Sequence, residues 1–319
     1  MNPNISAIKL GVSSCLLGNE VRYDGGHKRN AFVTHILRQY FEFVAICPEV
    51  AIGMGIPREP IRLVGDPLSP KAVGVRDLHF DVTVPLVDFS KRIMPQLHDI
   101  SGYILKKNSP SCGMERVKVY DKNSVPTNSG RGIFARELMH CYPCLPVEED
   151  GRLMDPNIRE NFIERVFIYH RWQQIVEQGL TPAALVRFHT DHKYAILSRG
   201  QKGYRELGRL VAQSGTNKEN FLTLTNDYIS LLMTVMSERA KRGHHANVLM
   251  HMMGYLRKRL AKEDKAELLH HIDNYRKGVV PLVVPVTLLR HYLRRFPDAY
   301  LQRQHYLKPY PEELKLRNH

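Results

Sequence analysis

The sequence predicts an α/β domain with a parallel, doubly wound sheet, followed by an all-α domain. Three apolar, strand-like runs in the first half of the chain alternate with helical patterns, the order that builds a parallel sheet. After residue 150 strand patterns nearly vanish, and helical patterns follow one another. Because the polar segment 148–151 separates these two regions, we expect one domain over residues 1–150 and a second over residues 151–319.

Each element of the first domain follows from its local pattern. The strands are expected at residues 8–14, 41–46 and 100–105. Helices are expected over about 28–40 and 89–99, where apolar residues recur with helical spacing. The segment 48–87 is rich in Gly and Pro, so we expect it to be irregular. It either lines a pocket or has a purely structural role.

Helices of the second domain begin at recognisable signals. Asp155-Pro156 and Thr181-Pro182 each place an N-cap residue before a proline, which fits the first position of a helix. Helical patterns are expected at about 157–178, 182–191, 201–213, 217–240, 246–260, 262–277 and 284–296.

The positive charge of the chain is concentrated in the second domain. The net charge is +14 over 319 residues. Up to residue 150 there are 18 Lys and Arg against 16 Asp and Glu, whereas the remainder holds 28 against 16. A basic domain beside a nearly neutral one favours a polyanion such as nucleic acid as partner. The alternative is a solvated surface that only confers solubility.

The cysteines and the N-terminal residues indicate the cellular compartment of the protein. Five cysteines is an odd number without compact disulfide spacing, which favours a reducing cytoplasm where cysteines bind metal or do chemistry. The first residues lack the basic and apolar regions of a signal peptide, and no apolar run is long enough to cross a bilayer. We therefore expect a cytoplasmic protein with no membrane partner.

Three cysteines follow the three predicted strands. Cys15, Cys47 and Cys112 each come just past a strand, and strand ends of a parallel sheet converge on one crevice. Three thiolates suit an iron–sulfur cluster or a zinc ion, and the residues alone leave that choice open. Glu49 and Ser109 lie close to these cysteines in sequence, so we expect both in the same crevice, for proton transfer and for positioning water.

The pair Cys141 and Cys144 forms a C-x-x-C motif outside this set. It can act as a redox dithiol, as half of a zinc site or as an auxiliary ligand. The simpler interpretation, two packed thiols near the domain junction, is slightly favoured.

At these residues the sequence resembles a known family. The motifs Ser13-Ser-Cys15-Leu-Leu-Gly18, Cys47-Pro-Glu49 and Ser109-Pro-Ser-Cys112-Gly113 resemble the thiouracil desulfidases. The helical half, including 188–194 and 198–208, resembles the companion domain of two-domain bacterial tRNA 4-thiouridine desulfidases.

The resemblance implies a [4Fe-4S] cluster on Cys15, Cys47 and Cys112, with one iron not bound by protein. Glu49 and Ser109 match the catalytic residues of the family. The implied reaction removes sulfur from 4-thiouridine in tRNA without net redox change, leaving uridine and hydrosulfide. The stretch 50–55 departs from the expected Gly-Gly form, which bears on the shape of the pocket and not on the ligands.

The helical domain would then hold the tRNA, and no obligate protein partner is expected. The cations expected to meet RNA are Lys193, Arg199, Lys202, Arg205, Lys241, Arg242, Arg257, Lys258 and Arg259. Tyr194, Tyr204 and Tyr255 are interleaved with them and can stack on unpaired bases. His189 and His192 are expected to serve packing or RNA contact.

Other functions remain open on the sequence alone. One is a non-catalytic RNA-binding protein whose cysteines, including Cys141 or Cys144, hold a structural metal in a closed site. Another is a redox enzyme that works through the C-x-x-C motif. A third is a desulfidase that acts on free thiouracil.

Overall fold

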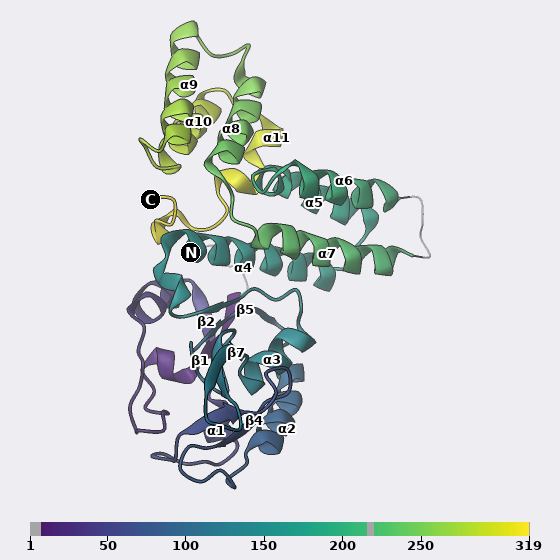
Figure 1. Cartoon of the computed structure of the whole chain (residues 1–319). Coiled ribbons are helices and arrows are strands. Elements are labelled where there is room, and N and C mark those ends of the chain that lie inside the picture. Colours follow the sequence, from purple (N-terminus) through teal and green to yellow (C-terminus); the bar gives the residue numbers. More distant parts are fainter. Residues whose placement is uncertain (1–7, 216–219, 319) are drawn as a thin grey trace. The chain divides into compact units, whose positions relative to one another are not determined.

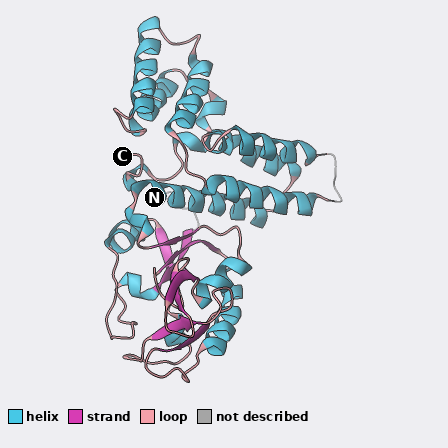
Figure 2. Ribbon diagram, viewed as in Figure 1, coloured by secondary structure: helices cyan, strands magenta, loops and turns pink. Residues whose placement is uncertain are grey.

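The computed structural model describes residues 8–215 and 220–318, which fall into two compact units (Figure 1). The first unit ends at Asp155 and the second begins at Pro156. Within the described residues, strands occur only in the first unit, and the second is built from helices (Figure 2). The predicted fold class, an α/β domain followed by an all-α domain, is confirmed.

The first unit contains a four-stranded parallel sheet, called sheet A. Its strands lie in the order β2-β1-β5-β8. They are β1 (Ile8–Ser13), β2 (Phe41–Ile46), β5 (Ile100–Leu105) and β8 (Val147–Glu149). The order reverses at β1, as in doubly wound sheets, where ligands bind beside the carboxyl ends of the strands. The strands β1 and β2 end together, since Ser13 pairs with Ile46.

A second, mixed sheet, called sheet B, was not predicted. Its order is β4-β3-β6-β7. The strands are β3 (Ile61–Val64), β4 (Lys71–Gly74), β6 (Val117–Tyr120) and β7 (Pro126–Gly130). Because β3 and β4 fall in the segment 48–87, the prediction that this segment is irregular is wrong. Both β3 and β4 are only four residues long and lie among glycines and prolines, so their patterns are too short to stand out in the sequence.

Short helices connect the strands of the first unit. They are α1 (Pro48–Ala51), α2 (Thr83–Ile93) and α3 (Ile133–Cys141), with 3-10 turns at Ser14–Leu17, Met94–Leu97 and Arg152–Met154. The helix predicted over 28–40 is instead a π-helical turn, Phe32–Ile36, followed by the 3-10 turn Leu37–Gln39. The helix α2 begins six residues before the predicted position.

The second unit closely follows the predicted helical patterns. Its long helices are α4 (Pro156–Glu177), α5 (Pro182–Leu197), α6 (Gln201–Gln213), α7 (Phe221–Ser237), α8 (Arg242–Leu256), α9 (Lys262–Lys277) and α10 (Val283–Arg295). The short elements α11 (Ala299–Gln302), His305–Leu307 and Glu312–Leu314 follow. The pattern predicted at 217–240 begins outside the described residues. Among the described residues, no helix combines the length and the apolar character that crossing a membrane requires.

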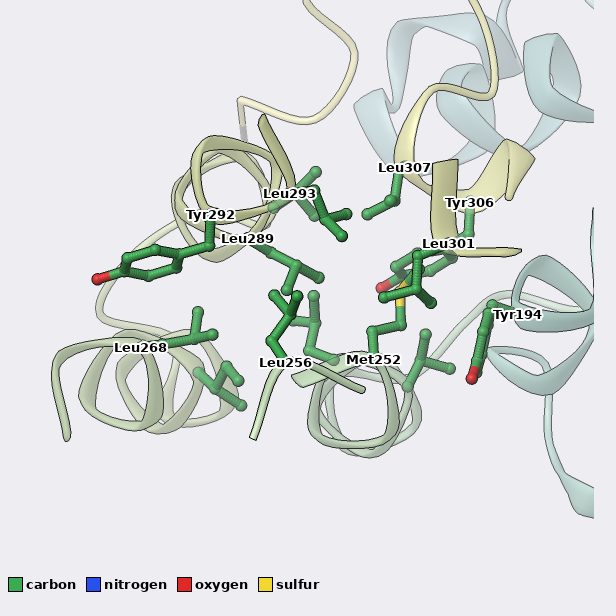
Figure 3. Packing of buried hydrophobic residues seen from close by; sticks show 14 of the residues in the cluster. Tyr194, Met252, Leu256, Leu268, Leu289, Tyr292, Leu293, Leu301, Tyr306 and Leu307 are labelled. Atoms are coloured by element: carbon green, nitrogen blue, oxygen red, sulfur yellow. The ribbon is translucent and has the colours of Figure 1, made fainter. Parts of the chain in front are cut away.

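Two apolar cores hold the second unit together. One joins α5 and α8 to the C-terminal helices, and Figure 3 shows Met252, Leu256 and Leu289 directed into it. The other is aromatic: Trp172 of α4 packs against Phe188 at 5.4 Å and Tyr228 at 5.6 Å between ring centroids. Burial of such large side chains is the main stabilising contribution in a helical domain of this size.

Buried histidines lie beside the aromatic core. His189 hydrogen-bonds the Tyr228 hydroxyl at 3.2 Å, and His192 stacks on His305 at 4.4 Å between ring centroids. Burial lowers the pKa of His189 to about 4 and that of His305 to about 3, from the ordinary 6.5. The histidines therefore stay neutral in the folded chain at physiological pH.

This burial predicts that the second unit loses stability in mild acid. Between the unfolded pKa of 6.5 and the folded values of about 4 and 3, the unfolded chain binds more protons than the folded chain. The free energy of unfolding therefore falls as the pH drops below 6.5, by roughly 3 kcal/mol for each histidine near pH 4. Urea unfolding followed by far-ultraviolet circular dichroism measures the loss.

A matched pair of variants tests the cause. His305→Gln should reduce the pH dependence, whereas His251→Gln, at an exposed position of α8, should leave it as in the wild type. An equal free energy of unfolding at neutral pH and near pH 4 in the wild type would contradict the prediction.

Candidate functional site

Three cysteines lie around one cavity at the carboxyl edge of sheet A. Cys15 lies two residues beyond β1, Cys47 directly follows β2, and Cys112 lies seven residues beyond β5. All three line a cavity of about 780 Å³. Glu49 and Ser109 line the same cavity, so the topology brings together all five residues that the sequence analysis selected.

The three thiols are shielded from water. Burial raises the pKa of Cys15 to about 11 and also raises the pKa of Cys47. Burial raises the pKa of Cys112 well above its usual value, and a hydrogen bond with Ser13 offsets only part of this effect. Without a metal the thiols are therefore protonated at neutral pH, and a bound metal has to displace these protons.

The loop 109–113 holds Cys112 in place. Ser109 Oγ accepts hydrogen bonds from the backbone N–H groups of Ser111 at 3.2 Å and of Cys112 at 3.1 Å. Gly132 packs so closely that a Cβ there would lie 2.5 Å from the Ser111 carbonyl oxygen. The Ser109 oxygen thus uses its acceptor capacity on the loop, and its hydroxyl hydrogen remains available for donation.

Glu49 is fixed by two partners on opposite oxygens. Arg58 donates to Glu49 Oε2 from Nε at 3.0 Å and from the terminal nitrogen NH2 at 2.6 Å. Ser111 Oγ donates to Glu49 Oε1 at 2.9 Å. The Arg58 side chain is 4% exposed and also donates to the Val21 carbonyl at 2.9 Å. The carboxylate is therefore held in one orientation by a charge-assisted fork.

Arg58 and Ser111 were not selected from the sequence. Arg58 lies nine residues beyond Glu49 in the segment expected to be irregular, and nothing in its local pattern indicates an ion pair. Ser111 adjoins Cys112, so its proximity to the motif is a signal that could have identified it. The prediction selected Ser109 because it matches the catalytic serine of the family that the sequence resembles.

A buried tyrosine hydroxyl adjoins the thiols. Tyr103 on β5 is fully buried, and a Cβ added at Gly11 would lie 2.1 Å from its ring. Burial raises the pKa of Tyr103 well above its usual value, and the proximity of the three cysteines raises it further, so the hydroxyl and the thiols share one buried region. Among the described residues, the hydroxyl has no hydrogen-bond partner. Because buried hydroxyl groups normally have a hydrogen-bond partner, we expect an additional polar group beside the Tyr103 hydroxyl.

Cations predominate around the cavity. The lining cations are Arg22, Arg58, Arg62, Lys106, Lys107, Arg116 and Lys118. Glu49 is the one acidic residue among the described residues of the lining. Arg58 is paired with Glu49, and Lys106 is paired at 2.9 Å with Asp150, which lies outside the lining. The excess of positive charge favours an anionic molecule at the cavity mouth.

The two remaining cysteines lie apart from this cavity. Cys141, at the end of α3, is exposed, and Cys144 is partly buried. Neither lines the cavity. In the part of the chain that the structure describes, no three His, Cys, Asp or Glu side chains are grouped so that they could share one metal ion.

Some of the cations and tyrosines predicted to meet RNA gather in the second unit. Lys193, Tyr204, Arg205 and Tyr255 line a cavity of about 390 Å³. The Lys193 ammonium lies 5.8 Å from the centroid of the Tyr204 ring, and Tyr255 stacks on Tyr300 at 5.4 Å. The other exposed predicted cations are Lys202 on α6, Lys241 and Arg242 at the start of α8, and Arg257, Lys258 and Arg259 after it.

The prediction that Arg199 and Tyr194 contact RNA is wrong, because both side chains are buried. The Arg199 side chain is 5% exposed and forms an ion pair with Glu164, which is 4% exposed, so Arg199 does not lie on an open RNA-binding surface. Tyr194 is buried in the core shown in Figure 3 and cannot stack on a base. His189 and His192 are buried, consistent with packing. Sequence patterns cannot distinguish these residues from exposed ones on the same helix.

The fold and the site define an α/β domain with a thiol-lined cavity, joined to a basic helical domain. Family models match both parts: residues 10–150 match 2-thiouracil desulfurase, and residues 193–311 match a protein family of unknown function, DUF1722. The chain combines both of these domains and belongs to the family of YbgA-like proteins.

Individual relatives are similar to parts of the chain. Uncharacterized protein YbgA of Escherichia coli (strain K12) is 34% identical over 154 residues, which is 48% of this chain and 90% of YbgA. Uncharacterized protein YbbK of Bacillus subtilis (strain 168) is 36% identical over 108 residues, 32% of this chain and 71% of YbbK. The solved structure of the [4Fe-4S]-dependent thiouracil desulfidase TudS is 28% identical, covers 46% of this chain and 94% of its own, and has a TM-score of 0.36.

Proposed function

We propose that this protein removes sulfur from 4-thiouridine in tRNA, giving uridine and hydrosulfide, with a [4Fe-4S] cluster held by Cys15, Cys47 and Cys112. The observation that carries the proposal is the convergence of these thiols with Glu49 and Ser109 on one cavity. The match of residues 10–150 to the 2-thiouracil desulfurase family supports the same type of reaction.

The residues present fit such a cluster. Three thiols are the donors that iron–sulfur clusters take, and the nearby carboxylate, Glu49, is already held by Arg58 and Ser111. In a cluster each thiolate binds its own iron, so the thiols need not converge on one point as they must for a single zinc ion. The buried Tyr103 hydroxyl, which has no partner among the described residues, is consistent with a polar group at this position.

Glu49, Ser109 and Ser111 have separate roles in the proposed reaction. When bound, the cluster would supply an iron without a protein ligand, a Lewis acid suited to the sulfur of a thiocarbonyl. Glu49, held in one orientation by the Arg58 fork, accepts the proton of the attacking water. Ser109, whose oxygen accepts hydrogen bonds from two backbone N–H groups, donates a hydrogen bond through its hydroxyl to the substrate or the water. Ser111 keeps Glu49 oriented toward the cavity.

The charges favour an RNA substrate over a free base. A neutral thiopyrimidine gains little from a cavity lined by seven cations, whereas a nucleotide brings phosphates that pair with them. The tyrosines and cations around the cavity lined by Lys193 and Tyr204 add surfaces that can contact bases and phosphates. These contacts can offset the few kcal/mol needed to unstack the thiolated base.

Free thiouracil is the second candidate, because the matching family is named for it. The deciding experiment uses anaerobically purified protein with reconstituted cluster, incubated with tRNA containing 4-thiouridine or with free thiouracil. Loss of thiocarbonyl absorbance is followed together with released sulfide. We expect matched loss and release with the tRNA, and a kcat/KM at least tenfold lower with the free base.

Each other outcome has a definite meaning. A higher kcat/KM for the free base would overturn the tRNA assignment and keep the desulfidase. Unchanged absorbance with both substrates, while tRNA still binds in a salt-sensitive manner, would favour the non-catalytic RNA-binding protein.

A further inference from the structure

A second cavity lies within the unit that begins at Pro156. It has a volume of about 290 Å³, and four arginines from separate segments line it. They are Arg199 just after α5, Arg239 between α7 and α8, Arg242 at the start of α8, and Arg317 in the C-terminal segment. Guanidinium groups repel one another, so their convergence on one cavity needs a compensating negative charge.

Two of these arginines form ion pairs with glutamates. Glu164 forms an ion pair with Arg199, and Glu160 Oε1 accepts from Arg317 Nε at 2.9 Å. His245 also lines the cavity, but burial and the surrounding arginines lower its pKa well below its usual value, so it is neutral. Among the described residues of the lining, four arginines accompany one carboxylate, Glu160, so positive charge exceeds negative charge there.

The start of α8 adds to the positive potential. This helix begins at Arg242, its N-cap side chain makes no capping hydrogen bond, and its first turn holds no acidic residue. Both Arg242 and His245, from this first turn, line the cavity. The first N–H groups of a helix and its dipole favour a negative charge at this end.

One donor of the arginine set is buried and unused. The Arg199 side chain is 5% exposed, and its Nε has no hydrogen-bond partner among the described residues. Arg242 donates one hydrogen bond, from NH1 to the Tyr275 carbonyl at 3.0 Å, whereas a guanidinium carries five N–H donors in all. The cavity thus offers arginine donors beyond those that the protein itself uses.

We infer that this cavity binds a phosphate group. Its volume is that of several water molecules, each of which takes about 30 Å³ in the liquid, so a phosphate fits. Arginine forks bind phosphate oxygens in pairs, and four of them beside a helix N-terminus satisfy an oxyanion on several sides. The ligand is either a phosphate of RNA or free phosphate, which share this chemistry. The inference does not depend on the desulfuration reaction.

Inorganic phosphate is the first probe, and the readout is the thermal unfolding of the full chain. At equal ionic strength, phosphate should raise the Tm above its value in chloride, and the rise should saturate with concentration. Arg242→Gln and Arg239→Gln should each weaken the apparent affinity by about tenfold, the effect of losing a charged hydrogen bond. Both residues lie at the cavity rim rather than in a buried ion pair with Glu164, so the variants should fold.

A control and a competition complete the test. Arg209→Gln, at an exposed position of α6 outside the cavity lining, should keep the affinity of the wild type. Equal Tm values in phosphate and chloride, or a full phosphate shift in the Arg239→Gln/Arg242→Gln double variant, would overturn the inference.

Competition with a short RNA then identifies the source of the phosphate. If the RNA competes only when it carries a 5′-phosphate, the cavity takes a terminal phosphate. If it competes with or without that group, the cavity takes a backbone phosphate. If it does not compete, the cavity takes free phosphate. Each of these results, together with the saturable shift, supports the site.

Discussion

Replacing Glu49 with Gln is expected to slow desulfuration by about a thousandfold, within the range for loss of a general base. The Gln side chain keeps the size and one oxygen of the carboxylate but cannot take a proton from water. Arg58 and Ser111, which hold the two oxygens of Glu49, remain in place to orient the amide. Single-turnover loss of thiocarbonyl absorbance measures the rate, with iron content determined on the same sample.

Two further variants separate chemistry from folding. Because Arg58 is 4% exposed, loss of the negative charge beside it also lowers stability, so thermal unfolding is measured in parallel. Ser111→Ala keeps the ion pair and removes only the hydrogen bond to Glu49, and it should cost about tenfold in rate. Glu20→Gln, at an exposed position, is the control. A Glu49→Gln enzyme that retains cluster and more than a tenth of the wild-type rate would show that Glu49 is not the base.

Replacing Cys112 with Ser is expected to remove both the cluster and the activity. Cys112 is 6% exposed and lies on a loop held by Ser109 and Gly132, so its position is fixed. Serine preserves the volume but is a poor ligand for iron–sulfur clusters. Iron and acid-labile sulfide per chain, with the visible absorption of the cluster, should fall to near zero in this variant.

Cys144→Ser is the matched control, because Cys144 is partly buried but does not line the cavity. It should retain wild-type iron, sulfide and activity. The opposite pattern, metal lost with Cys144→Ser and kept with Cys112→Ser, would support the closed structural metal site. Loss of activity without loss of iron in Cys144→Ser would instead favour redox chemistry through the C-x-x-C motif.

The sequence by itself determined the fold class and the location of the site. Strand runs of period two or of continuous apolar residues, and helix patterns of period 3.6, reflect local burial, so they can be detected without a structure. Cys15, Cys47 and Cys112 each follow such a run, and the carboxyl ends of parallel strands meet at one edge. That rule sufficed to predict that the three cysteines share a crevice with Glu49 and Ser109.

Only the tertiary structure decided which partners these residues have. The ion pair between Glu49 and Arg58, the hydrogen bond from Ser111 and the strand β3 depend on how the segment 48–87 folds against the rest of the first unit. The burial of Arg199, which the sequence suggested for an open surface, depends on Glu164 of another helix. Side-chain pairs of this kind join segments distant in sequence, and no local period encodes them. They arise only when packing brings the two segments together.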